Sequence, residues 1–175
     1  MAGYVIHLAV AEQYIKNFPK DIDNYNDFIE GVIYPDSVSD KSLTHYGTKS
    51  SKPNLKAFLD EKEIDNCFNK GYFLHLITDY IFYNKFIEYY STDIYNDYDI
   101  LNKTLINKFN VKLPDSVKDK VFYKEGTTKI LNLDKTVNFI KNVAKYKLDD
   151  VKQKNNNGDR YWCTFRELKH ITSEV

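Results

Sequence analysis

The 175-residue sequence has little of what turn-rich or disulfide-rich proteins use. It contains six glycines and four prolines, which favours helices over a β fold with many turns. Its two cysteines, Cys67 and Cys163, form no CxxC motif and no disulfide framework, so we expect two reduced, buried thiols. Arg160 and Arg166 are the only arginines. Any phosphate binding must therefore rely on another group, such as a metal ion.

Strong net charge and a long hydrophobic run are also missing. The 25 Lys and Arg residues balance 25 Asp and Glu residues, so we expect neither stable nucleic-acid binding nor capture by an anionic membrane. The longest apolar stretch, 71–82, is too short to span a bilayer and contains His75 and Asp79. The first residues lack the basic region of a signal peptide, and His7 breaks their apolar run. The sequence therefore predicts a soluble, cytoplasmic protein without a transmembrane segment.

The spacing of apolar residues predicts one all-α domain over residues 1–175. Helices are predicted over residues 4–18, 25–33, 55–59, 65–90, 92–109 and 134–148, and in a short segment after Pro114. The helix 65–90 is apolar on nearly every face through its middle, as expected of a buried helix. The predicted fold is a single-domain helical bundle of six or seven helices around this long buried central helix.

Two segments are predicted to be irregular. Residues 36–54 are polar and contain glycine, proline and several serines, which predicts a long loop of the kind that is often functional. Residues 151–160 include the tract KQKNNNGD and are predicted to be a polar linker. The linker leads to an aromatic segment, 161–171, which we expect to dock on the core, although its aromatic rings could also stack on a base.

Three histidines and two aspartates in the first half of the chain form the most informative pattern. His75 and Asp79 are four residues apart on the predicted central helix, so their side chains project from one face. Their neighbours are large and apolar, where an unpaired carboxylate is costly and a divalent ion removes the cost. Alone, this HxxxD pair could also be a buried ion pair, with Asp79 bound to His75 or to a lysine.

Two further residues complete a candidate set of four ligands. Asp36 follows the second predicted helix, and His45 lies nine residues later in the predicted loop. Taken singly, Asp36 fits a turn or cap and His45 a surface histidine. With His75 and Asp79 they offer two nitrogen and two oxygen ligands, a set that suits zinc or, less selectively, manganese or iron. His7 lies between apolar neighbours, and on its own it fits a satisfied core histidine.

The elements IHLAVAEQYI, GVIYPDSV, THYG and GYFLHLITDYIFYNKF occur in this order and resemble the zinc-dependent phospholipase C family. That family is related in fold to single-strand-specific fungal nucleases. Its members are all-α proteins that bind up to three zinc ions and hydrolyse phosphoester bonds. The resemblance implies that Asp36, His45, His75 and Asp79 hold one zinc ion. It also implies that Asp79 bridges to a possible second ion, bound by His7 and the start of the chain.

The sequence also departs from the family's pattern, and the resemblance covers only about residues 4–90. The family has a further histidine about six residues after the HxxxD aspartate, where this chain has Lys85. No histidine occurs between His75 and His170, and the chain begins MAGY where secreted members use an N-terminal tryptophan amine as a ligand. The sequence therefore favours one ion and resembles a member with part of its ligand set missing.

The resemblance and the ligand set together predict a metal-dependent hydrolase that acts on a phosphoester through a zinc-bound water. Zinc would lower the pKa of this water and polarise a phosphoryl oxygen. Asp36 is the candidate general base, by similarity to its counterpart in the family. The expected substrate is a small phosphoester or a phospholipid head group. Two alternatives stay open: a non-catalytic relative that keeps a structural metal in a binding or scaffold protein, and a metal-free helical domain whose histidines only pack.

Overall fold

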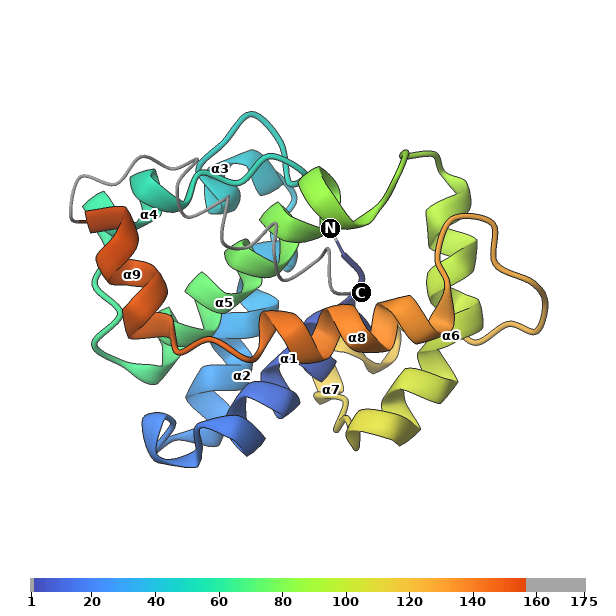
Figure 1. Ribbon diagram of the computed structural model, residues 1–175, viewed down its shortest axis with the longest axis horizontal. Coiled ribbons are helices and arrows are strands. Elements are labelled where there is room, and N and C mark those ends of the chain that lie inside the picture. The colour runs from blue at the N-terminus through green and yellow to red at the C-terminus, as the bar shows by residue number, and fades with distance from the viewer. Residues whose placement is uncertain (1, 157–175) are drawn as a thin grey trace.

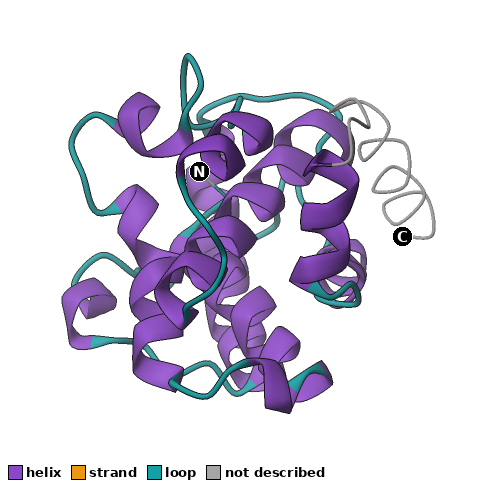
Figure 2. Cartoon of the chain, turned by 90° about the vertical axis from the view of Figure 1, so that its left-hand side faces the viewer, coloured by secondary structure: helices purple, strands orange, loops and turns teal. Residues whose placement is uncertain are grey.

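The computed structural model describes residues 2–156, and all regular structure within this range is helical (Figure 1; Figure 2). The α-helices are α1 (Tyr4–Asn17), α2 (Tyr25–Ile33), α3 (Lys41–His45), α4 (Leu55–Glu61), α5 (Cys67–Ile81), α6 (Asp93–Phe109), α7 (Asp115–Lys118), α8 (Leu133–Val143) and α9 (Leu148–Asn156). Two 3₁₀ turns, η1 (Pro19–Asp21) and η2 (Tyr34–Asp36), and one π-helical turn, η3 (Phe82–Phe86), join them. The prediction of an all-α fold is confirmed. None of these helices is both long enough and apolar enough to cross a membrane.

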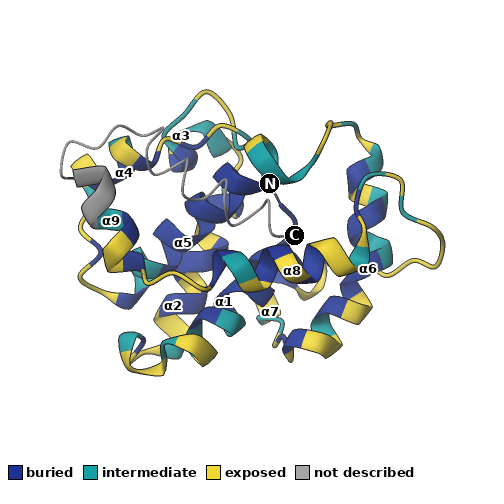
Figure 3. Ribbon diagram, viewed as in Figure 1, coloured by how far each residue is buried: buried dark blue, intermediate teal, exposed yellow. Residues whose placement is uncertain are grey.

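Helix α5 is the buried central helix that the sequence predicts. Every residue from Gly71 to Phe82 is buried, which is why no polar face interrupts the sequence here (Figure 3). The helix is shorter than the predicted 65–90. It begins after Asn66, whose side chain accepts a hydrogen bond from the N–H of Asn69, and it passes at Phe82 into η3.

Glycine lets α2 and α5 cross with their backbones almost in contact. A Cβ added at Gly31 of α2 would lie 2.0 Å from the carbonyl oxygen of Phe68, and one at Gly71 of α5 would lie 2.1 Å from that of Phe28. A larger residue at either position would therefore push the two helices apart. Because His75 lies one turn beyond Gly71, this crossing sets how closely the His75 ring approaches α2.

The N-terminal segment is held against the same core. Gly3 has a φ of 82°, a conformation that favours glycine, and a Cβ added there would lie 3.2 Å from the ring of Tyr98 on α6. Residue Ala2 is fully buried. Helix α1 then packs against α2, α5, α6 and α8 and carries His7 into the interior.

The segment 36–54 is not one long loop, because it contains helix α3, and the prediction is wrong there. The Asp40 side chain accepts a hydrogen bond from the N–H of Ser42 at 3.1 Å, which caps the start of this helix. The Tyr72 hydroxyl donates to the carbonyl oxygen of the residue before His45 at 2.6 Å. His45 is thereby fixed on a helix that α5 holds in place.

Two boundaries near the C-terminus also differ from the prediction. The sequence predicts one helix over 134–148, whereas α8 ends at Val143 and α9 begins at Leu148. Helix α9 runs to Asn156, so the linker prediction is wrong for residues 151–156. Leu148 is buried and α9 packs against α4 and α5, so tertiary contacts outweigh the polar composition. The rest of the linker and the aromatic segment after it lie outside the described residues.

The crossing of α2 and α5 predicts a large effect from one added methyl group. We expect Gly31→Ala to lower the free energy of unfolding by about 2–3 kcal/mol, because the new Cβ meets backbone that cannot rotate away. Urea denaturation measures this change. Asn26→Ala on the exposed face of α2 is the control, with an expected change within about 0.5 kcal/mol of zero. Equal stability of the two variants would contradict the role of the crossing.

Candidate metal centre

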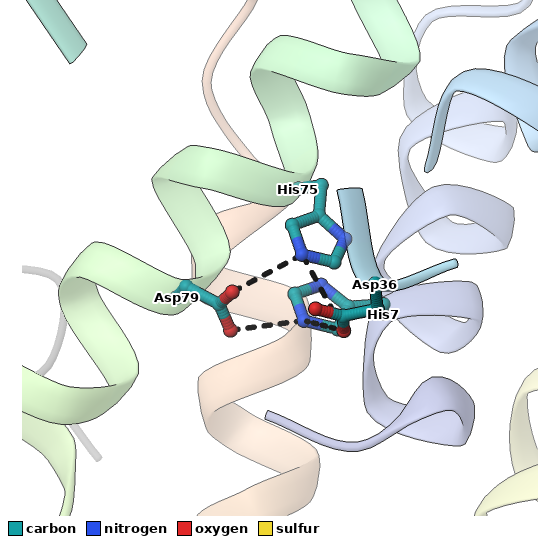
Figure 4. Close-up of side chains that lie close together, drawn as sticks. All are labelled: His7, Asp36, His75 and Asp79. Carbon is teal, nitrogen blue, oxygen red and sulfur yellow. Dashed lines mark hydrogen bonds and ion pairs between the residues drawn. The ribbon is translucent and has the colours of Figure 1, made fainter. Parts of the chain in front are cut away.

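Five side chains from four elements converge in the interior. His7 comes from α1, Asp36 from the end of η2, His45 from the end of α3, and His75 and Asp79 from α5. None of the five is more than 5% exposed. Figure 4 shows His7, Asp36, His75 and Asp79 pointing toward one another.

Four of these residues lie close enough together that they could hold a metal ion. One ligand atom from each of His7, Asp36, His75 and Asp79 lies within 4.8 Å of all the others. The Nε2 atom of His75 is 3.5 Å from Asp36 Oδ2 and 3.1 Å from Asp79 Oδ2. Ligands about 2.1 Å from a shared ion stand roughly 3–4 Å apart. The cluster can therefore hold a metal ion.

His45 approaches the same cluster with its Nε2 atom. This atom lies 3.3 Å from His75 Nε2, 3.0 Å from Asp79 Oδ2 and 3.6 Å from Asp36 Oδ1. Its distances to these three residues match those within the group of four. The structure thus brings together all five residues that the sequence predicts as ligands.

Two of the histidines are oriented by backbone carbonyls. The Nδ1 atom of His75 lies 2.6 Å from the Val32 oxygen, and that of His45 lies 2.7 Å from the Lys41 oxygen. A carbonyl can only accept, so each Nδ1 carries a proton and donates it, which directs the Nε2 atom to the cluster. Val32 belongs to the last turn of α2, where carbonyls lack intrahelical partners. This hydrogen bond therefore gives the Val32 carbonyl a partner and orients the His75 ring toward the cluster.

Asp79 presents its two carboxylate oxygens to two sides of the cluster. Oδ1 lies 2.9 Å from His7 Nε2 and accepts a hydrogen bond from the backbone N–H of Ala2 at 2.9 Å. Oδ2 lies 3.0 Å from His45 Nε2 and 3.1 Å from His75 Nε2. This carboxylate has the geometry to join the side of His7 to the side of the other two histidines.

Asp36 is the polar group whose environment is least complete. Both of its carboxylate oxygens and the Nδ1 atom of His7 are buried without a hydrogen-bond partner among the described residues. An ionised carboxylate in this condition costs several kcal/mol unless a cation lies beside it. Protonated His75, with its Nε2 atom 3.5 Å from Asp36 Oδ2, offsets part of this cost, and a bound divalent ion would offset the rest, so the cluster could hold a metal ion.

The charges of the cluster act strongly on one another. Burial disfavours the charged form of His75, but the nearby Asp36 and Asp79 carboxylates outweigh it and raise the pKa of His75 to about 9. Burial and the charge on His75 lower the pKa of His7, whose ring stacks on that of His75 at 3.6 Å. Burial alone would raise the pKa of Asp36, yet the charge on His75 brings it down to about 2. Both ionic partners of His75 thus stay available as ligands at neutral pH.

Some features of the site have no signal in the sequence. Nothing in the pattern indicates that the Val32 carbonyl orients His75, or that the N–H of Ala2 binds Asp79.

Lys85 stands in η3, where the zinc-dependent phospholipase C family has a further histidine. Cys67 lies away from the cluster and donates to Asp23, and burial raises the pKa of its thiol, as expected of an unreactive cysteine. The second cysteine lies outside the described residues.

Metal binding should be measurable as stability. We expect zinc at about 100 times its Kd to raise the free energy of unfolding by about 2.7 kcal/mol, because the ion binds only the folded cluster. His75→Gln should abolish most of this gain, since it removes a ligand at the centre of the site. Thermal unfolding with and without metal, together with the metal content of the purified protein, tests the expectation. Asn138→Gln, an exposed change on α8, is the control and should keep the wild-type gain. A wild-type protein without metal or stabilisation would contradict the site.

Metal affinity should depend on pH. With a pKa of about 9 in the metal-free protein, His75 carries at neutral pH a proton that an ion must displace. We therefore expect zinc affinity to rise roughly tenfold per unit between about pH 6 and pH 8, with about one proton released per ion. Calorimetric titration in two buffers of different ionisation enthalpy counts these protons. Affinity that is constant over this range would show that His75 is not a ligand.

No family model, curated protein or solved structure matches the chain. The resemblance to the zinc-dependent phospholipase C family stays a prediction, carried by the four short elements that contain the cluster. The function of the site has to be inferred from its own geometry.

Proposed function

We propose that this protein is a zinc-dependent hydrolase of phosphoric esters. The observation that carries the proposal is the buried Asp36 carboxylate. Its oxygens have no hydrogen-bond partner in the described part of the chain, and they face the Nε2 atoms of three histidines at 3.5–3.9 Å. The resemblance to the zinc-dependent phospholipase C family supports it, because the same residues are the ones that the family's pattern marks as ligands.

The type of donor also favours a catalytic centre. Structural zinc sites in proteins are mostly built from cysteines, whereas catalytic ones use histidine and carboxylate. Here the described donors are three histidines and two aspartates. The π-helical turn η3 begins three residues after Asp79, and such turns often occur at functional sites.

The residues of the cluster would have separate roles in the proposed reaction. When bound, the ion supplies Lewis-acid activation of a water molecule and of a phosphoryl oxygen. His45 and His75, each held by a backbone carbonyl, fix the direction of their Nε2 atoms. Asp36 is both a ligand and the acceptor proposed for the proton of the attacking water. Its low pKa in the metal-free protein suits the ligand role better than the base role.

A structural metal in a binding or scaffold protein is the second candidate. The observation that favours it is burial, since the ligands are between 0% and 5% exposed and structural zinc sites are closed. The two candidates differ in whether a ligand position stays open to substrate. A cytoplasmic location, the absence of stable nucleic-acid binding and the use of zinc over manganese or iron stay predictions from the sequence.

Turnover separates the two candidates. We expect the zinc-loaded protein to hydrolyse members of a panel of phosphomonoesters and phosphodiesters, and Asp36→Asn to lower kcat at least about 100-fold by removing a negative ligand and proton acceptor. Asp60→Asn, an exposed change of the same type, should leave kcat unchanged. A protein that binds zinc stoichiometrically, folds normally and turns over no ester would establish the structural role instead.

A further inference from the structure

A cavity of about 350 Å³ opens where α3, η3 and the start of α6 meet. Its walls come from the start of α3, the loop after α3, the turn η3 and the beginning of α6. The lining residues are Lys41, Lys49, Ser50, Ser51, Lys52, Tyr83, Asn84, Tyr90 and Tyr95. A cavity of this size accommodates a small organic ligand.

Bonds and charges tie this cavity to the metal ligands. The carbonyl oxygen of Lys41 accepts the hydrogen bond that orients His45. Tyr83 lies four residues after Asp79 along the central helix, so the two side chains are about one turn apart. Burial, and after it the charge of Asp79, raises the pKa of Tyr83, which shows that the hydroxyl lies within electrostatic reach of that carboxylate. The cavity therefore borders the elements that carry His45 and Asp79.

The charge of the cavity is of one sign. Three lysines line it, and none of its described lining residues is an aspartate or glutamate. Lys49 and Lys52 are exposed and carry their charge at the mouth. In a partly closed cavity, such charges attract an anion more strongly than they would in open solvent.

The neutral side chains of the cavity are hydrogen-bond donors. The hydroxyls of Tyr90 and Tyr95 lie 3.0 Å apart, and this bond together with burial raises the pKa of Tyr95 to about 12. The phenol therefore keeps its proton at neutral pH. Ser50 and Ser51 add two more hydroxyls. Hydroxyls and ammonium groups are the donors that phosphate oxygens accept from when arginine is absent.

Aromatic rings also bind quaternary ammonium groups, so the tyrosines alone would admit a choline head group. The lysines decide between the two ligands. Three lysines and no carboxylate occur among the described lining residues, so the lining itself repels a cation and attracts a phosphate dianion. A phosphomonoester carries close to two negative charges at neutral pH.

We propose that this lysine-lined cavity is the substrate pocket and that it selects a phosphomonoester over a zwitterionic phosphodiester; the assignment of a substrate rests on the proposed hydrolase function. In the reaction, water adds to phosphorus and the bond from phosphorus to the alcohol oxygen breaks. One proton of the water reaches that oxygen, so the products are inorganic phosphate and the free alcohol. The lysines bind and orient the phosphate and take no proton.

Two esters with the same leaving group test the selection. We expect the zinc-loaded protein to hydrolyse p-nitrophenyl phosphate with a higher kcat/KM than p-nitrophenylphosphorylcholine. In the double variant Lys49→Gln/Lys52→Gln, KM for the phosphate should rise roughly fivefold at low salt with little change in kcat, and KM for the choline ester should fall or stay constant. Lys135→Gln/Lys145→Gln, an exposed change of equal charge away from the cavity, should behave as wild type.

The outcomes distinguish the pocket from the hydrolase function. Two outcomes contradict the proposed pocket and leave the hydrolase function intact. One is a higher kcat/KM for the choline ester, and the other is an unchanged KM for p-nitrophenyl phosphate in Lys49→Gln/Lys52→Gln. If neither ester is hydrolysed, the proposed hydrolase function is wrong. Calorimetric titration with inorganic pyrophosphate then tests whether the lysine-lined cavity binds phosphate. Pyrophosphate binding that is about fivefold weaker in Lys49→Gln/Lys52→Gln than in Lys135→Gln/Lys145→Gln supports the proposed pocket. Equal affinity in the two variants, or no binding at all, contradicts the pocket.

Discussion

The close crossing of α2 and α5 is the constraint on which the site depends. Gly31 and Gly71 bring the two backbones so near that a single added carbon would overlap a carbonyl oxygen. At this separation the His75 ring reaches the Val32 oxygen in the last turn of α2, and Asp36 follows the last residue of α2 by three residues. One contact between helices thus sets two ligands from separate parts of the chain. Elsewhere in the core, packing can adjust by rotation of side chains, whereas a contact between backbones cannot.

The cluster is a compromise between folding and binding. Five ionisable side chains are buried together, and the hydrogen bonds among them leave Asp36 unsatisfied. A protein selected only for stability would fill such a volume with apolar side chains. The stacked rings of His7 and His75 add a second cost whenever both are charged. A divalent ion relieves both problems, because it neutralises the carboxylates and binds the histidines in their neutral form.

The sequence predicts the parts of this site that are local. His75 and Asp79 are recognisable because helical spacing places them on one face, and the uninterrupted apolar stretch around them indicates burial. The position of His45 on a helix is hard to recognise because α3 has only five residues. The bond that holds α3 to α5, from Tyr72 to the Thr44 carbonyl oxygen, joins residues 28 apart in sequence. Spacing alone likewise leaves His7 as an ordinary core histidine. Only the resemblance to a family indicated its role, and the structure brings it within 2.9 Å of Asp79.

Charge balance connects the number of ions to the proposed pocket. Asp36 and Asp79 contribute two negative charges, which a single divalent ion neutralises when the three histidines are neutral ligands. A second divalent ion on the His7 side of Asp79 would leave two buried positive charges without a partner, a cost that burial makes large. A phosphate dianion in the proposed pocket would bring the missing negative charge toward the elements that carry His45 and Asp79. The second ion and the substrate would then bind more tightly together than either does alone, because each lowers the electrostatic cost of the other.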